Sequence, residues 1–132
     1  PSISEGGRFV SFQSNALNLV NGDTNNAMDI FVRDTCWGAS SGCKPTTLRV
    51  SVATDGTQGD SHSFDPALCA DGRIVAFAST ATTLVAGDGN SVQDIFVAIT
   101  GLNRSGNGAA VLEANKGGSG SSERSLALRA GR

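Results

Sequence analysis

Two loops of the chain carry oxygen-bearing side chains at the spacing of a hard-cation site. Residues 21–29 and 86–94 share the pattern Asp-x-Asn-x-x-x-Asp, so the calcium candidates are Asp23, Asn25, Asp29, Asp88, Asn90 and Asp94. Alternating carboxylate and amide oxygens suit Ca²⁺, because a tight loop can wrap them around the ion. The same residues can instead form Asx-type turns and tie each loop to the strand that follows. Both loops lack the central Gly and the final Glu of an EF-hand loop, and this favours the structural interpretation.

A histidine lies among serines and aspartates in Asp60–Asp65, which brings the residue types of a hydrolase triad together. A triad is assembled in space around a strained nucleophile, and the chain has no Gly-x-Ser-x-Gly elbow. Neighbours on one strand or turn cannot all point at one another. We therefore interpret His62 as a loop histidine and expect neither catalytic residues nor a resident cofactor in this segment.

The cysteines predict one disulfide. Cys36 and Cys43 flank a Gly/Ser-rich stretch, a spacing that suits a bridge across a hairpin loop and favours it over two free thiols. Zinc needs about four ligands, and only Cys69 and His62 remain as candidates. A disulfide implies an oxidising compartment, the periplasm or the cell exterior. Cys69 is expected to be a small buried residue.

The elements that position these residues come from a duplication. Pro1–Thr35 aligns without a gap to Pro66–Thr100, a shift of 65 residues, with about half of the positions identical. In each copy a short apolar segment precedes a Gly-containing turn and an alternating strand, Arg8–Ser14 or Arg73–Ser79. After the Asp/Asn loop, Asp-Ile-Phe-Val predicts a buried third strand.

Fourth strands complete the repeats. Thr46–Val52 predicts one after the first copy, and Ala109–Glu113 is the candidate after the second. Four antiparallel strands joined by turns describe a propeller blade. We therefore predict an all-β fold with two blades, at 1–64 (repeat core 1–35) and 65–115 (repeat core 66–100), and a disordered Gly/Ser-rich tail at 116–132.

The motifs also resemble a known repeat. The pattern Pro-x-(apolar)-x-x-(Asp/Gly)-Gly-Arg-x-Val-x-Phe-x-Ser, followed by Gly-Asp-x-Asn and Asp-Ile-Phe-Val, is similar to the TolB-type, WD-like repeat of bacterial exported β-propellers. The resemblance covers Pro1–Thr100, with further echoes of the family at Arg49–Val52 and Asp55–Gly59, and departs from it at Gly6, where Asp is usual. It implies a propeller, export, and a scaffold that binds a ligand or a protein.

The repeat also helps to assign roles to individual side chains. Arg8 and Arg73 are equivalent, which indicates a structural role in holding the turn or a carboxylate of a neighbouring blade. Trp37 beside Cys36 is either an exposed contact residue or a cover for the disulfide.

Composition limits the partners. The formal net charge of −2 offers no basic field for nucleic acid, and no apolar run is long enough for membrane insertion. We expect a non-catalytic binding scaffold that is periplasmic or extracellular, and two blades with open faces also predict self-association into a fuller propeller. The alternatives are the propeller segment of an exported hydrolase and, more weakly, a calcium-binding adhesion-like module.

Overall fold

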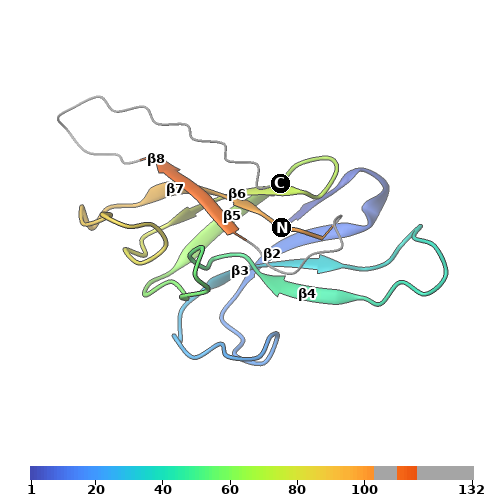
Figure 1. Ribbon diagram of the computed structural model, residues 1–132, viewed down its shortest axis with the longest axis horizontal. Coiled ribbons are helices and arrows are strands. Elements are labelled where there is room, and N and C mark those ends of the chain that lie inside the picture. The colour runs from blue at the N-terminus through green and yellow to red at the C-terminus, as the bar shows by residue number, and fades with distance from the viewer. Residues whose placement is uncertain (103–109, 116–132) are drawn as a thin grey trace.

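The computed structural model describes residues 1–102 and 110–115, which fold into two antiparallel sheets (Figure 1). The first sheet consists of β1 (Ser2–Ile3), β2 (Phe9–Ser14), β3 (Asp29–Asp34) and β4 (Thr46–Arg49). The second consists of β5 (Ser63–Leu68), β6 (Ile74–Ser79), β7 (Asp94–Ile99) and β8 (Ala110–Asn115). Each strand pairs with its neighbours along the chain. The prediction of an all-β fold is confirmed, and the one helical element among the described residues is a 3₁₀ turn at Glu5–Gly7.

Strand bounds follow the sequence pattern closely, with one instructive difference. The predicted fourth strand of the first repeat extends to Val52, whereas β4 ends at Arg49. One backbone bond continues past the ladder, from the Val50 amide to the Ile30 carbonyl at 2.8 Å, but no backbone bond returns from Ile30. The Ile30 amide in turn donates to Ser51 Oγ at 3.1 Å. The predicted strand after the second copy is present as β8, and the predicted tail at 116–132 lies outside the described residues.

The sequence duplication is also a duplication of structure. Phe12 pairs with Phe31 in the first sheet, and Phe77 pairs with Phe96 at the equivalent place in the second. Both pairs stack, with ring centroids 5.7 Å apart in the first sheet and 5.8 Å apart in the second. Because cross-strand partners share a side, these aromatic pairs define the same face of each sheet, which we call face B.

The opposite face, face A, carries the residues that alternate with these along β2 and β3 or along β6 and β7. In the first sheet it includes Phe9, Ile30 and Val32, and in the second it includes their equivalents Ile74, Ile95 and Val97.

Face A of the first sheet packs on face B of the second. The shared core contains Phe9, Ile30, Val32 and Val50 from the first repeat and Val75, Phe77, Ala81, Leu84, Phe96 and Ala98 from the second. Backbone bonds cross the same boundary, because the Glu5 amide donates to the Ala70 carbonyl at 2.8 Å and the Ser63 amide to the Met28 carbonyl at 2.7 Å. The sheets thus meet through different faces, a head-to-tail contact.

Phe9 fills a space that a glycine leaves open. Gly72, in the turn before β6, has φ of +74°, and a Cβ built on it would lie 2.2 Å from Phe9 Cδ2 and 3.0 Å from Phe9 Cβ. The equivalent Gly7 has φ of +79°, but its nearest side-chain atom would be 3.8 Å away. Gly72 therefore meets two requirements, a left-handed backbone and close packing, whereas Gly7 meets only the first.

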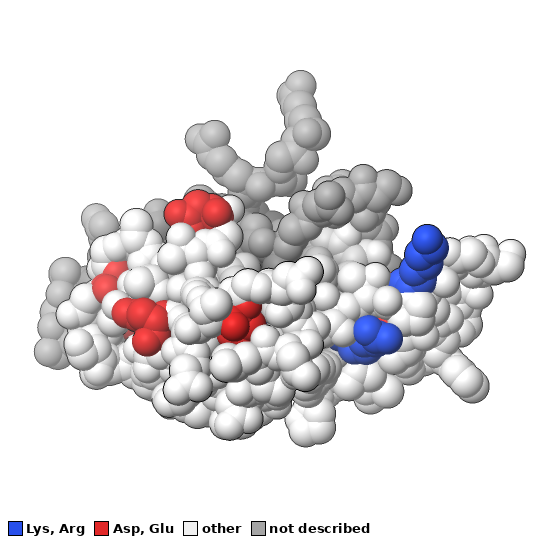
Figure 2. All heavy atoms as spheres, turned by 90° about the horizontal axis from the view of Figure 1, so that it is seen from below, with Lys and Arg blue, Asp and Glu red and all other residues white. Residues whose placement is uncertain are grey.

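The described residues include no helix that is long and apolar enough to cross a membrane. On the face shown in Figure 2, acidic and basic side chains lie in separate regions with a mostly uncharged surface between them. This face therefore presents no broad patch of one charge.

Candidate functional site

The two Asp/Asn loops fold alike. Asn25 Nδ2 donates to Asp29 Oδ2 at 3.0 Å, and Asn90 Nδ2 donates to Asp94 Oδ2 at 3.3 Å. Each asparagine also accepts, through Oδ1, the amide two residues later at 3.1 Å. The residue after each asparagine has a left-handed backbone, with φ of 55° at Asn26 and 56° at Ser91. These Asx turns are the ones that the structural interpretation of the loops predicted.

In the first loop a cation of the chain itself lies between the two carboxylates. Arg49 Nη1 lies 2.9 Å from Asp23 Oδ1 and 3.6 Å from Asp29 Oδ2, and all three side chains are buried. Gln58 Oε1 accepts from the same Arg49 nitrogen at 3.0 Å, and it also accepts the Thr24 amide at 3.2 Å. The guanidinium thus occupies the place considered for calcium in this loop.

Burial and hydrogen bonding in this cluster shift the pKa of Asp29 in opposite directions. Desolvation raises the pKa of Asp29, while hydrogen bonds from Ser51 and Asn25 and the charge of Arg49 oppose the rise. Arg49 and Ser51 were not among the predicted site residues. They belong to the Arg-Val-Ser-Val stretch at the fourth strand, and the sequence resemblance noted at Arg49–Val52 was the available signal.

The second loop has a different residue at the register position of Arg49. Arg49 pairs with Phe31 across the first sheet, and the residue at the same register position in the second sheet is Ala114, opposite Phe96. Asp88 is 9 % exposed and Asp94 is 1 % exposed. Asp88 Oδ1 is buried and has no hydrogen-bond partner. The same loop geometry therefore encloses two carboxylates with an uncharged residue in the register position of the arginine.

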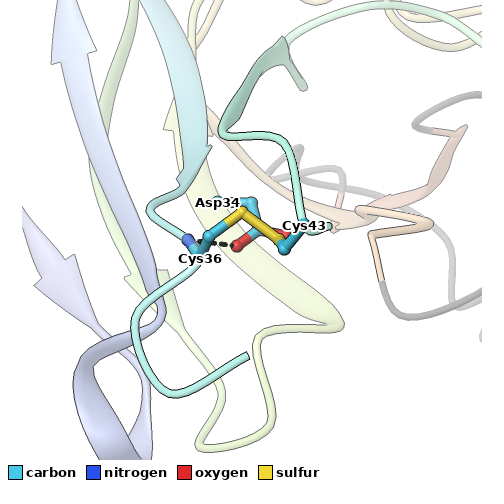
Figure 3. A group of neighbouring side chains, drawn as sticks. All are labelled: Asp34, Cys36 and Cys43. Atoms are coloured by element: carbon cyan, nitrogen blue, oxygen red, sulfur yellow. Dashed lines mark hydrogen bonds between the residues drawn. A yellow bond between two sulfur atoms is a disulfide. The ribbon is translucent and has the colours of Figure 1, made fainter. Parts of the chain in front are cut away.

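The cysteines form the predicted disulfide. Cys36 and Cys43 are joined by a 2.01 Å S–S bond with their Cα atoms 5.8 Å apart. Figure 3 shows the bond beside Asp34, whose Oδ1 accepts the Cys36 amide at 2.9 Å. The ligand atoms of these three residues lie within 4.8 Å of one another. Paired sulfurs carry no thiolate to bind a metal, so this cluster is a cross-link and not a metal centre while it is oxidised.

Arg8 completes the disulfide cluster. Its Nε and Nη2 atoms donate to the two oxygens of Asp34 at 2.9 and 2.8 Å, a bidentate pair that lowers the pKa of Asp34. Arg8 thus binds a carboxylate, as predicted, but Asp34 belongs to its own sheet and not to a neighbouring blade. The equivalent of Asp34 in the second repeat is Ile99, so the repeat does not supply Arg73 with the same partner.

Cys69 differs from its prediction. Its side chain is only half-buried, and Sγ accepts the Ile74 amide at 3.0 Å and contacts Asp71 Oδ1 at 2.8 Å. It lies at the start of the turn before β6 and not in the core, because the turn exposes that position.

Trp37 is 74 % exposed, which fits the prediction of an exposed contact residue. A methyl group on Gly7 would lie 3.9 Å from Trp37 Cδ1 and 3.8 Å from Ile3 Cδ1, and Ile3 is also exposed. Ile3 and Trp37 therefore form a small apolar patch beside the disulfide loop, which is the kind of surface that protein contacts use.

His62 has a structural role. Its Nδ1 accepts the Met28 amide at 2.9 Å, which joins the two repeats. The neighbouring hydroxyls pair elsewhere, Ser61 Oγ with Thr80 Oγ1 at 2.8 Å and Ser63 Oγ with Ser79 Oγ at 3.0 Å. The interpretation of His62 as a loop histidine fits these contacts.

A shallow hollow of about 420 Å³ lies between loops of the two repeats. Its lining is Ala53, Thr54, Asp55, Thr83, Leu84, Val85 and Ala86. Asp55 is the single ionisable residue of this lining, so the hollow is suited to packing against a partner more than to acid–base chemistry.

No family model matches this chain, and searches of curated proteins and of solved structures gave no match either.

Proposed function

We propose that this chain supplies two adjacent blades of a TolB-type β-propeller and acts as an exported, non-catalytic scaffold for binding a protein or ligand. Four-stranded antiparallel meanders arranged in tandem are the units from which propellers are built. The sequence resemblance over Pro1–Thr100 supports the same assignment, and the disulfide fits an oxidising compartment outside the cytoplasm.

One observation carries the proposal: equivalent residues of the two repeats differ in exposure, and the buried ones are those that the second sheet covers. Phe9 is 4 % exposed, whereas its equivalent Ile74 is 45 % exposed. Ile30 is fully buried, whereas its equivalent Ile95 is 47 % exposed. Face A of the second sheet is therefore apolar at the positions that the first sheet buries.

Head-to-tail contacts propagate until the array closes. Face A of the second sheet has the same pattern as the face that receives a sheet within this chain. A third unit of the same kind, from the same polypeptide or from another copy, would bury Ile74 and Ile95 as the second sheet buries Phe9 and Ile30. Stacking of such units would explain both the blade-like sheets and the exposed apolar residues Ile74 and Ile95 on face A.

The binding role rests on the loops at the blade edges. Ile3 and Trp37 project beside a cross-linked loop, and a covalent bridge lowers the entropy lost when such a loop contacts a partner. No arrangement of nucleophile and base competes with this role among the described residues discussed above.

Sedimentation of the full chain tests the proposal. We expect species larger than the 13.4 kDa chain to form as concentration rises. The double variant Ile74→Asp, Ile95→Asp should shift the equilibrium to the single chain, because it places charges on face A. Val92→Asp, which changes a residue of similar exposure on a loop, should behave as the wild type. A single chain at every concentration, with a cooperative melt, would contradict the proposal.

A further inference from the structure

We propose that the two open faces of this chain fit each other, so that copies of the chain join head to tail. Face A of the second sheet of one copy covers face B of the first sheet of the next, with Ile74 seated at Gly7 beside Ile3 and Trp37. This assembly rests on the proposed function, and it names as partner a second copy of the chain and the surface that this copy uses.

Face B is partly open in the first sheet and covered in the second. Leu84 is 2 % exposed in the second repeat, whereas its equivalent Leu19 is 36 % exposed in the first. Phe77 is fully buried, whereas its equivalent Phe12 is half-buried. Leu84 and Phe77 belong to the core that the first sheet covers. In the described part of the chain, face B of the first sheet therefore lacks a cover where the second repeat has one.

The apolar patch of Ile3 and Trp37 continues this open face. Ile3 lies on face B, because it pairs with Val10 across β1 and β2. Its equivalent is Leu68, and the same shift of 65 residues places Leu102 at the position of Trp37. Leu68 and Leu102 pack against the core between the sheets, whereas both members of the patch are exposed. The second repeat thus shows this patch in its covered form.

The turn glycines indicate where Ile74 is seated. Inside the chain, the Phe9 ring lies so close to Gly72 that a Cβ there would meet it at 2.2 Å. At the equivalent Gly7, a Cβ would meet, apart from its chain neighbours, only the two patch side chains at 3.8 and 3.9 Å. The space that Phe9 fills over Gly72 is therefore free over Gly7. Since Ile74 is the equivalent of Phe9, a second copy can place Ile74 in that space.

One side chain distinguishes the open face from the covered one. Ala98 is fully buried between the sheets, and its equivalent on face B of the first sheet is Arg33. Arg33 Nη1 donates to Thr47 Oγ1 at 2.9 Å within its own sheet. Covering face B removes this guanidinium from water, which is unfavourable. Contact between copies should therefore be weaker than the packing inside the chain and should depend on concentration.

Sedimentation of a mixture of two variants, each with one face disabled, tests the head-to-tail order. The double variant Ile74→Asp, Ile95→Asp disables face A, and the double variant Ile3→Asp, Leu19→Asp disables face B. Each variant alone should remain a single chain. An equimolar mixture should form a dimer that grows no further, because one intact face A meets one intact face B.

Three further measurements keep the test independent of damage to the fold. Asn18→Asp adds a charge next to Leu19, at a position whose equivalent Thr83 stays exposed in the covered repeat, and it should associate as the wild type does. Arg33→Ala restores the alanine of the covered repeat and should strengthen association roughly 5-fold or more. Trp37 is the single tryptophan of the chain, so its fluorescence emission should move to shorter wavelength as copies associate.

The outcomes separate this assembly from the proposed function. If the wild type associates but the mixture of disabled variants does not pair, or if the face B variant associates as the wild type does, the head-to-tail contact is overturned while the exposed face A keeps its role. Unchanged association of Arg33→Ala, or unchanged Trp37 emission, would equally overturn the use of face B. A wild type that stays a single chain at every concentration would contradict both.

Discussion

Replacement of Gly72 by alanine tests the stacking of the two sheets directly. The new methyl group would lie 2.2 Å from Phe9 Cδ2 and 2.6 Å from Phe9 Cγ. These atoms belong to the base of the ring and not to the far end of a flexible side chain, so the whole ring must move. Because Phe9 lies in the core between the sheets, that movement must disturb the packing of one sheet on the other.

Two effects add in this variant. A residue with a Cβ in the left-handed region costs about 1–2 kcal/mol, and overpacking of a filled core costs about 1–3 kcal/mol more. Gly72→Ala should therefore lower the free energy of unfolding by about 2–5 kcal/mol. Gly7→Ala is the matched control, because Gly7 has the same backbone geometry and no atom within 3.4 Å of the new methyl group. Gly7→Ala should lower the free energy of unfolding only by the cost of the left-handed backbone, about 1–2 kcal/mol.

Urea denaturation followed by circular dichroism, at protein concentrations low enough to prevent association, measures both losses. A third measurement isolates the contact: in a Phe9→Ala background, the cost of Gly72→Ala should fall towards that of Gly7→Ala, because the ring atoms at 2.2 and 2.6 Å are gone and only the Cβ at 3.0 Å remains. Equal losses for the two glycine variants in the wild-type background would refute the stacking of Phe9 on the second turn.

Two further predictions concern the disulfide loop. Asp34 has a lowered pKa because Arg8 binds it, so its contribution to stability is present above the unfolded pKa of about 3.9 and is lost as pH falls through the lower folded value. Thermal melts at pH 7 should show Asp34→Asn to be less stable by about 1 kcal/mol, and the difference should shrink steadily as pH falls below about 3.9. The opposite effect of Asp29 is common to both proteins and cancels. The double variant Cys36→Ser, Cys43→Ser should lose about 2–3 kcal/mol by the loop-entropy estimate, and an unchanged urea midpoint would show that the bridge does not constrain the unfolded chain.

The candidate sites show how much of a binding site can be predicted from residue types and spacing. The Asp-x-Asn-x-x-x-Asp pattern identified both loops and offered calcium or a structural turn for each. Spacing along the chain could not decide between them, because the deciding residue in the first loop, Arg49, comes from a different strand. Only the pairing of β3 with β4 brings its guanidinium to Asp23, and only the register of β7 with β8 shows an alanine in that place in the second sheet.

The sequence repeat also suggested that equivalent residues make equivalent contacts, and for Arg8 and Arg73 the partners differ. Arg8 and Arg73 occupy the same position of the repeat, yet the bidentate carboxylate of Arg8 has become an isoleucine in the second copy. The alignment showed both the paired arginines and the change of Asp34 to Ile99, but not that Asp34 is the partner of Arg8, because residues 26 apart in the chain become neighbours only when β2 pairs with β3.

The sequence alone determined the strands, their order and the disulfide. Alternation, turn glycines and the duplication are local properties, and each acts over a few residues whatever the rest of the chain does. The tertiary structure decided which copy of each repeated residue is buried. Phe9 and Ile74, or Ile30 and Ile95, are alike in the sequence, and they differ because burial depends on whether another sheet lies above a residue. In the described part of the chain a sheet covers Phe9 and Ile30 on face A of the first repeat, whereas Ile74 and Ile95 on face A of the second repeat remain exposed.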